Sequence, residues 1–150
     1  MTLFIFIAIC LLAGYIGSRF TFVSVKTWYP TIKKPSWNPP NWIFAPVWTL
    51  LYILMAVAAW KVWKTADNAF GPMLIFAFQL VLNVAWSAIF FGKRNISLAF
   101  KEIILLWITV VATTAVFWSV DHFAGILFFP YVAWVTFAAF LNYTIDRMNK

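Results

Sequence analysis

WYPTIKKPSWNPPNWIFAPVWTLLYILMAVAAW, residues 28–60, joins a proline- and tryptophan-rich segment to an apolar run, and this junction decides the fold. Residues 28–42 hold four prolines, each of which removes a backbone donor and disfavours helix before it. They also hold four aromatic residues, which disordered linkers lack. We therefore predict an ordered loop at a membrane surface, leading into a spanning helix. An aromatic belt at the interface is the alternative.

The composition indicates a polytopic helical membrane protein. Of the 150 residues, 65% are hydrophobic and 10% are charged, and the mean hydropathy is +0.90. A soluble domain of this size does not need so much apolar surface. Cys10 and His122 are the sole residues of their types, so the sequence contains neither an intrachain disulfide nor a metal-binding constellation.

Five apolar segments are each long enough to cross about 30 Å of hydrocarbon as a helix. We predict spans at residues 3–25, 42–64, 69–91, 97–120 and 123–145. The three later connections are short, which favours antiparallel neighbours in one bundle. The fold class is therefore an all-α five-helix transmembrane bundle, with residues 1–150 as a single domain. The first segment lacks a basic n-region and is too long for a signal peptide, so we expect it to be retained.

The basic residues set the expected orientation. With five spans, only Lys61 and Lys64 share a side with the N-terminus. The other nine cations are Arg19, Lys26, Lys33, Lys34, Lys93, Arg94, Lys101, Arg147 and Lys150. The positive-inside rule then predicts an outside N-terminus, with the Pro/Trp loop and the C-terminus cytoplasmic. This asymmetry explains the net charge of +7 without a nucleic-acid partner.

The acidic residues argue against two classes of function. Asp67, Glu102, Asp121 and Asp146 are all predicted at or near helix ends, so no charge is expected at mid-membrane. Ion-coupled transporters usually need such a charge. The sequence also lacks a carboxylate pair, a nucleophile–histidine pair and a phosphate loop, so ordinary hydrolytic or transfer chemistry is unsupported.

Neutral polar residues remain as candidates for a site. Gln79, Asn83 and Ser87 recur at every fourth position and so share one helix face. They either hydrogen-bond neighbouring helices or form the wall of a pocket with a few polar groups. Both interpretations stay open.

Two aromatic stripes offer partners for this face. One carries Trp48, Tyr52 and Met55, and the other carries Trp134. Such stripes are more often packing than ligand sites. At about 1.5 Å per residue, the following positions lie roughly 5–12 Å below the loop side. They are Trp48, Asn83, Ser87, Ala138 and Asn142. If their helices face one another, these residues line one aromatic cavity beneath the loop.

Three blocks of the sequence resemble a known family. They are WYPTIKKPSWNPPNWIFAPVWTLLYILM (28–55), QLVLNVAWSAIFFG (79–92) and PYVAWVTFAAFLNYTIDRMN (130–149). Their order and spacing resemble the tryptophan-rich sensory protein / translocator protein family, which includes the mitochondrial peripheral benzodiazepine receptor. The resemblance implies a five-helix bundle, usually a homodimer, that binds porphyrins such as protoporphyrin IX and other large apolar ligands, including isoquinoline- or benzodiazepine-type drugs and sterols. It implies ligand-binding roles for Trp28, Tyr29, Pro39, Pro40, Trp48, Asn83, Ser87, Trp134, Ala138 and Asn142, with Gln79 as their neighbour.

The resemblance also implies chemistry at two tryptophans. In related proteins the positions matching Trp48 and Trp134 are implicated in light- and oxygen-dependent breakdown of protoporphyrin IX. No cofactor is required, because the porphyrin is the ligand. Leu141, Tyr143 and Arg147 fit a proposed sterol pattern, although this pattern is common at helix ends and Asp146 lies beside the arginine. A bacterial envelope membrane is favoured over the mitochondrial outer membrane.

Three functions follow from these observations. The first is a receptor or sensor for tetrapyrroles, with Lys33 and Lys34 at the rim to meet carboxylates. The second is photo-oxidative degradation of protoporphyrin IX by Trp48 and Trp134. The third is transport of porphyrins or lipids, which the absence of an inverted repeat disfavours.

Overall fold

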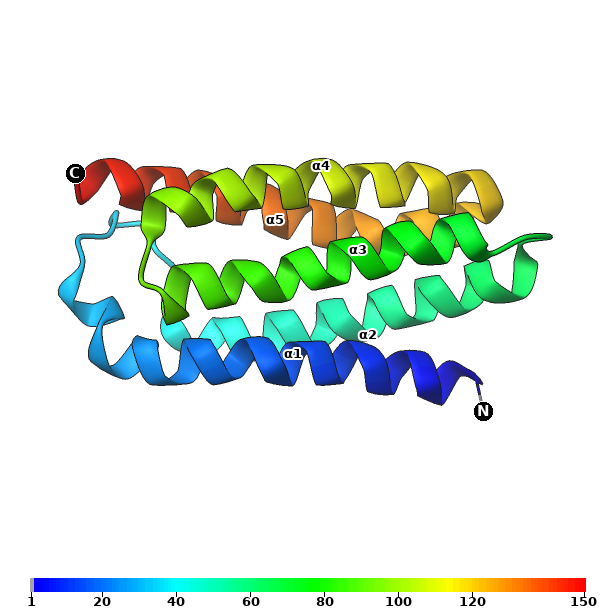
Figure 1. Cartoon of the computed structure of the whole chain (residues 1–150), viewed down its shortest axis with the longest axis horizontal. Coiled ribbons are helices and arrows are strands. Elements are labelled where there is room, and N and C mark those ends of the chain that lie inside the picture. The colour runs from blue at the N-terminus through cyan, green and yellow to red at the C-terminus, as the bar shows by residue number, and fades with distance from the viewer. Residues whose placement is uncertain (1) are drawn as a thin grey trace.

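The computed structural model describes residues 2–150 as a bundle of five long helices (Figure 1). Their bounds are α1 Thr2–Thr27, α2 Asn41–Thr65, α3 Phe70–Ser87, α4 Ile96–Val120 and α5 His122–Met148. Two short elements join them, the 3-10 helix η1 (Tyr29–Thr31) and the π-helical η2 (Ala88–Gly92), which continues α3. All five are long and apolar enough to span a membrane, which confirms the predicted fold class.

The predicted spans agree closely with these helices, and the largest difference is at the end of α5, which continues to Met148 rather than residue 145. Two side chains define the first residues of α4 and α5, which the apolar pattern left uncertain. The Asn95 side chain accepts from the backbone N–H of Leu98, and the Asp121 side chain accepts from those of Phe123 and Ala124. Both are N-cap contacts that satisfy otherwise unpaired helix donors.

Helix α1 changes partners along its length. Its N-terminal half packs on α2, where Phe6 contacts Trp63 and Gly14 lies so close to Tyr52 that an added Cβ would be 2.7 Å from the ring. Its C-terminal half packs on α3 and η2 instead. The contacts there are Gly17 with Ser87, Phe20 with Gly92, and Ser24, which donates a hydrogen bond to the carbonyl of Phe91. Helix α1 therefore crosses the bundle from α2 toward α3 as it approaches the loop.

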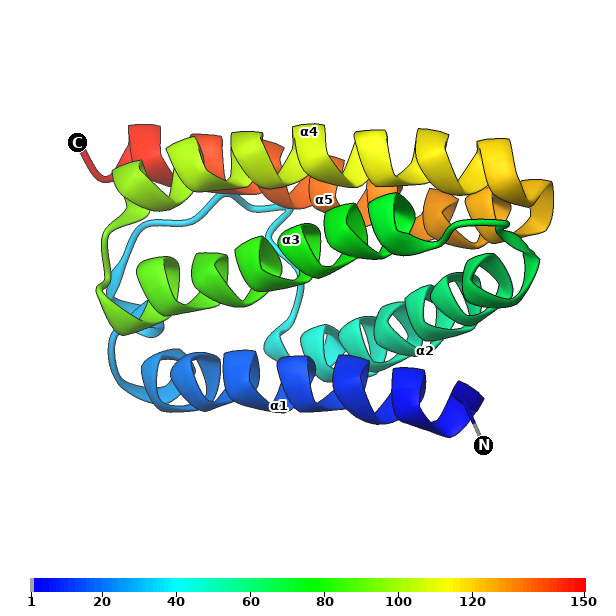
Figure 2. The ribbon, with the colours of Figure 1, turned by 45° about the vertical axis from the view of Figure 1, so that its right-hand side comes forward.

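The Pro/Trp loop is held against the end of α5. In Figure 2 it leaves α1, passes beside the C-terminal end of α5 and returns to α2. Asn149 fixes it by accepting from the backbone N–H of Lys33 and donating to the Lys33 carbonyl, at 3.0 and 2.9 Å. Trp37 packs edge-on against Phe137 of α5. The loop is thus an ordered segment, as predicted, and it is fixed to α5 on its way from α1 to α2.

The start of the loop is closed by a local cluster. The Tyr29 ring is buried, its hydroxyl donates to the Asn38 side chain at 3.0 Å, and burial raises the pKa of this phenol. Lys34 donates to the carbonyls of Tyr29 and Ile32 at 2.7 and 3.1 Å. Because its ammonium is used in this way, Lys34 is not the free rim cation that we expected.

Candidate functional site

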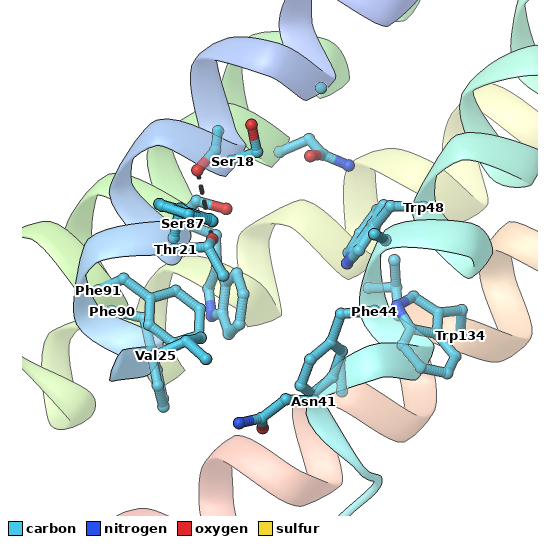
Figure 3. Close-up of a pocket in the computed structure, with 18 of the residues that line it drawn as sticks. Ser18, Thr21, Val25, Asn41, Phe44, Trp48, Ser87, Phe90, Phe91 and Trp134 are labelled. Carbon is cyan, nitrogen blue, oxygen red and sulfur yellow. Dashed lines mark hydrogen bonds between the residues drawn. The ribbon is translucent and has the colours of Figure 1, made fainter. Parts of the chain in front are cut away.

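A cavity of about 530 Å³ occupies the loop-side half of the bundle. All five helices contribute to its lining, and its walls are mainly apolar and aromatic. Its volume lies within the roughly 300–1,000 Å³ that is usual for small-molecule sites. Figure 3 shows two walls separated by open space, one carrying Trp48, Phe44 and Trp134 and the other carrying Ser87, Phe90 and Phe91.

The first wall is an aromatic cluster from α2 and α5. The rings of Trp48 and Trp134 meet edge to face, with centroids 6.3 Å apart and planes at 89°. Phe44 packs against Trp134 at 6.4 Å, and Tyr52 lies below Trp48 at 5.7 Å. Both tryptophans are half-buried, so one surface of each ring faces the cavity while the other is fixed by packing.

The second wall comes from the end of α3 and from η2. A π turn contains an extra residue relative to an α turn and rotates the side chains that follow it. Here it buries Phe90 and Phe91 together, with ring centroids 4.8 Å apart, and Trp86 stacks on Phe90 at 5.1 Å. Ser87, at the last α-helical position, lines the cavity between this aromatic group and α1.

The polar face of α3 is mostly paired within the protein. Tyr52 donates to the Asn83 carbonyl oxygen, and the Asn83 amide donates to the Tyr131 hydroxyl, both at 2.7 Å. Tyr131 in turn donates to Gln79 at 2.8 Å, and the Gln79 amide lies 3.9 Å from the sulfur of Met55. This chain of contacts joins α2, α3 and α5 beneath the cavity, which satisfies groups that would be costly to bury unpaired in hydrocarbon.

Asn142 is also committed to contacts between helices. Its side-chain oxygen accepts from the indole N–H of Trp86 at 2.9 Å, and its amide donates to the carbonyl of Ile96 at 3.1 Å. Within residues 2–150, by contrast, no hydrogen bond engages the indole N–H of Trp48 or Trp134 or the hydroxyl of Ser87. These three groups, together with the Asn41 and Lys26 side chains at the edge of the cavity, are therefore the polar contacts that it can offer to a ligand.

The charge of the lining is simple. As far as residues 2–150 define the lining, it contains one cation, Lys26, and no acid. The same residues hold no group of three metal-binding side chains. The cavity therefore favours neutral or anionic ligands over cations.

Glu102 lies near a helix end, as expected, but its carboxylate group is buried. It lies in the second turn of α4, about 9 Å from the start of the helix at 1.5 Å per residue. Both carboxylate oxygens are buried and have no hydrogen-bond partner among the described residues. The side chain is directed inward because Glu102 lies on the buried face of α4, three residues from Ala99 and four from Leu106.

Residues 6–148 match the TspO/MBR family. The chain belongs to that family. It is 45% identical to the tryptophan-rich protein TspO of Chlorobaculum tepidum over 99% of this chain and 96% of that protein. It is 38% identical to the human translocator protein over 92% of this chain and 84% of that protein. It is also 38% identical to the tryptophan-rich sensory protein of Cereibacter sphaeroides, over 81% and 77%.

Family membership confirms the resemblance seen in the sequence.

The structure divides the residues predicted to bind a ligand into two groups. Those that line the cavity are Tyr29, Trp48, Asn83, Ser87, Trp134, Ala138 and Asn142. Those outside its lining are Trp28, Pro39, Pro40 and Gln79. Trp28 packs on Phe90, and Gln79 is fully buried in the polar network. Pro40 is the N-cap residue of α2, and Pro39 directly precedes it.

The sterol pattern divides between two environments. Leu141 is buried and lines the cavity, whereas Tyr143 and Arg147 are exposed and hydrogen-bond each other at 3.1 Å. The three side chains do not form one surface for a ligand.

Sequence reasoning missed the contribution of α1 to this site. One edge of the helix lines the cavity, including Gly14, Gly17 and Thr21. The first four turns of α1 are apolar on all sides, so their pattern gave no inward face. Gly14 and Gly17 indicated close packing rather than a cavity, and the remaining signal was the pair Ser18 and Thr21, three positions apart.

Proposed function

We propose that this membrane protein is a receptor or sensor that binds porphyrins, with protoporphyrin IX as the test ligand, in the cavity between its helices. The observation that carries the proposal is the pair of aromatic walls facing each other across about 530 Å³. Flat apolar ligands stack favourably on such rings. Isoquinoline- or benzodiazepine-type drugs and sterols are expected to compete for the same space.

The free polar groups support a metal-free macrocycle. Two indole N–H groups and one hydroxyl can orient a ligand without ligating a metal. The Met55 side chain is 1% exposed, contacts Gln79 and does not line the cavity, so it is not placed as an axial ligand. Protoporphyrin IX is therefore favoured over tightly ligated haem.

The test is a titration of the purified protein with protoporphyrin IX in the dark, followed by tryptophan fluorescence. We expect saturable binding that the double variant Trp48→Phe/Trp134→Phe weakens. The matched control is Trp63→Phe/Trp118→Phe, because these tryptophans are exposed and lie outside the cavity. Equal affinity in all three proteins, or unsaturable partitioning by all three, contradicts the proposal.

Photo-oxidative degradation of protoporphyrin IX is a second candidate. Direct contact between the Trp48 and Trp134 rings inside the cavity favours it, because a bound pigment would lie against both. It predicts a defined product, dependence on light and oxygen, and more than one turnover per protein. Bleaching that stops at one equivalent while the protein's own tryptophans are consumed would refute it.

Transport of porphyrins or lipids ranks third. The five helices show no matched pair of broken spans among the described residues. Flux across vesicles above that of the Trp48→Phe/Trp134→Phe variant would promote this candidate.

Orientation, membrane and assembly complete the proposal. The multi-pass architecture and the similarity to bacterial proteins fit a bacterial membrane. We propose an outside N-terminus and a homodimer in that membrane. Labelling of single cysteines from each side tests the orientation, and cross-linking at low protein-to-lipid ratio tests the dimer.

A further inference from the structure

The exposed part of the cavity lining lies entirely on two helices. Residues of α3, α4 and α5 that line the cavity are buried or half-buried. The exposed lining residues of α1 are Leu11, Tyr15, Ser18, Phe22 and Lys26, and those of α2 are Asn41, Ala45 and Thr49. Within each helix these residues recur at intervals of three or four, so each set forms one edge. The cavity therefore opens between α1 and α2, on the lipid-facing side of the bundle.

The crossing of α1 produces this opening. Gly14 brings α1 against Tyr52 of α2 at mid-membrane. Beyond that point α1 follows α3 and η2, through Gly17 and Ser24. Helices α1 and α2 consequently separate toward the loop. On α2 the residues that face this gap, Ala45 and Thr49, are small or polar.

The route through the loop is obstructed by contrast. Tyr29, at the start of the loop, is buried, and Lys34 and Asn38 hold it in place. The clasp between Asn149 and Lys33 fixes the loop to α5. A ligand arriving from water on the loop side would have to displace these contacts, whereas a ligand dissolved in the membrane meets an open gap.

The rim of the gap also selects a chemistry. Lys26 lies in the last turn of α1, at the depth where a lysine reaches the headgroup region. Its ammonium lies 4.2 Å above the Phe22 ring, and no carboxylate pairs with it among the described residues. The Asn41 side chain stands on the opposite helix edge. An acidic headgroup at this position would meet a cation, while its apolar body extended inward to Trp48.

We propose that carboxylate-bearing amphiphiles enter this cavity sideways from the loop-side leaflet, through the gap between α1 and α2, with their acid group held at Lys26. This inference rests on the proposed ligand-binding role of the cavity and adds the route and the headgroup chemistry. Free fatty acids and porphyrins share that chemistry.

A photoreactive fatty acid tests the route without assuming that porphyrin is the ligand. The protein is placed in vesicles, a fatty acid with a mid-chain diazirine is added, and labelled peptides are identified after illumination at successive times. We expect label on residues 44–48 and 87–91. Ala45→Trp and Ser18→Trp, which narrow the gap from opposite edges, should slow this labelling severalfold. Ala8→Trp places the same bulk on an exposed position of α1 outside the cavity and should leave it unchanged.

The role of the acid headgroup is tested with the Lys26→Gln variant and with a fatty alcohol that has the same chain and diazirine as the fatty acid. Because ion pairs at exposed positions are weak, we expect the variant to reduce labelling by the acid about two- to fivefold. Labelling by the alcohol should not change. Folding of each variant is verified by its buried Cys10, which should stay unreactive to a thiol reagent. Equal labelling rates in the wild type, Ala45→Trp and Ser18→Trp would overturn the lateral route, and an equal effect of Lys26→Gln on acid and alcohol would overturn the headgroup assignment.

A final arm separates this inference from the proposed function. Association of protoporphyrin IX preloaded in the vesicle membrane should be slowed by Ala45→Trp and unaffected by Asn149→Ala, which releases the loop. Faster association in Asn149→Ala with no effect of Ala45→Trp supports access through the loop and refutes the inference alone. Cavity labelling by the fatty acid without saturable porphyrin binding refutes the proposed ligand and leaves the route supported.

Discussion

Replacing Tyr131 by phenylalanine removes one hydroxyl from the centre of the polar network. Tyr131 is 1% exposed, and its hydroxyl both accepts from Asn83 at 2.7 Å and donates to Gln79 at 2.8 Å. The substitution keeps the ring and its packing against Trp48 and Phe128. Its effect therefore isolates the contribution of two hydrogen bonds that join α5 to α3.

The expected loss follows from those two bonds. Side-chain hydrogen bonds between membrane helices contribute about 0.6 kcal/mol each on average, which sets a lower value near 1 kcal/mol. Leaving a buried donor or acceptor unpaired costs about 1–3 kcal/mol per group. Tyr52 engages only the Asn83 oxygen, so the Asn83 amide N–H and the Gln79 oxygen both lose their partner, and we expect a total destabilisation of about 1–6 kcal/mol. For a chain of this size this corresponds to a decrease in Tm of roughly 2–24 °C.

The assay uses the protein's own thiol. Cys10 is the single cysteine and is buried, so a thiol-reactive dye reports unfolding during a thermal ramp. The matched control is Tyr143→Phe on the same helix, because the Tyr143 hydroxyl is at the exposed surface and bonds only Arg147 among the described residues. A Tm equal to that of the control would refute the view that the polar face of α3 is a structural network.

Three further predictions concern packing, capping and the loop. Gly14→Ala should destabilise the protein by about 1–3 kcal/mol, because the new Cβ would press on the Tyr52 ring, whereas Gly71→Ala, which meets no neighbouring atom, should not lower the Tm. Asp121→Ala should cost about 1 kcal/mol of stability by removing the cap of α5, and Asp121→Asn should restore most of it. Asn149→Ala should accelerate limited proteolysis within the Pro/Trp loop several-fold without lowering the Tm by more than a few degrees.

Each of these has an opposing outcome. Equal melting temperatures for the two glycine variants would show that α1 and α2 can separate freely. Destabilisation of Asp121→Asn as large as that of the alanine variant would attribute the effect to the ion pair with Lys61, 3.8 Å away, rather than to the cap. Unchanged proteolysis of Asn149→Ala would mean that the other loop contacts suffice.

The architecture was predictable because it depends on composition and length. Five apolar runs near 20 residues leave few alternatives in a membrane, where backbone groups must be satisfied within each span. The helix limits followed from the same runs, and Asn95 and Asp121 are ordinary capping residues. The position of Ser87, on the same face as Asn83 and at the right depth for the cavity, followed from helical periodicity alone.

The site was only partly predictable because helix rotation and partner choice are tertiary properties. Periodicity placed Gln79 on the same face as Asn83. It could not show that Gln79 accepts a hydrogen bond from Tyr131 and so is not available to a ligand. Charge position placed Glu102 near a helix end, but not the inward turn of its side chain. The aromatic residues of the loop predicted that it is ordered, but not its contact with Asn149, which lies 116 residues from Lys33.

The crossing of α1 has a consequence for biosynthesis. Only 17% of the spanning window of α1 is buried, compared with 33% in each of the other helices. Its polar anchor Ser24 bonds to Phe91, which lies 67 residues further along the chain. At about 5–20 residues per second, that partner is synthesised roughly 3–13 s after the anchor. The C-terminal half of α1 therefore remains in lipid for seconds before its partners α3 and η2 are made, while its N-terminal half can already pack on α2.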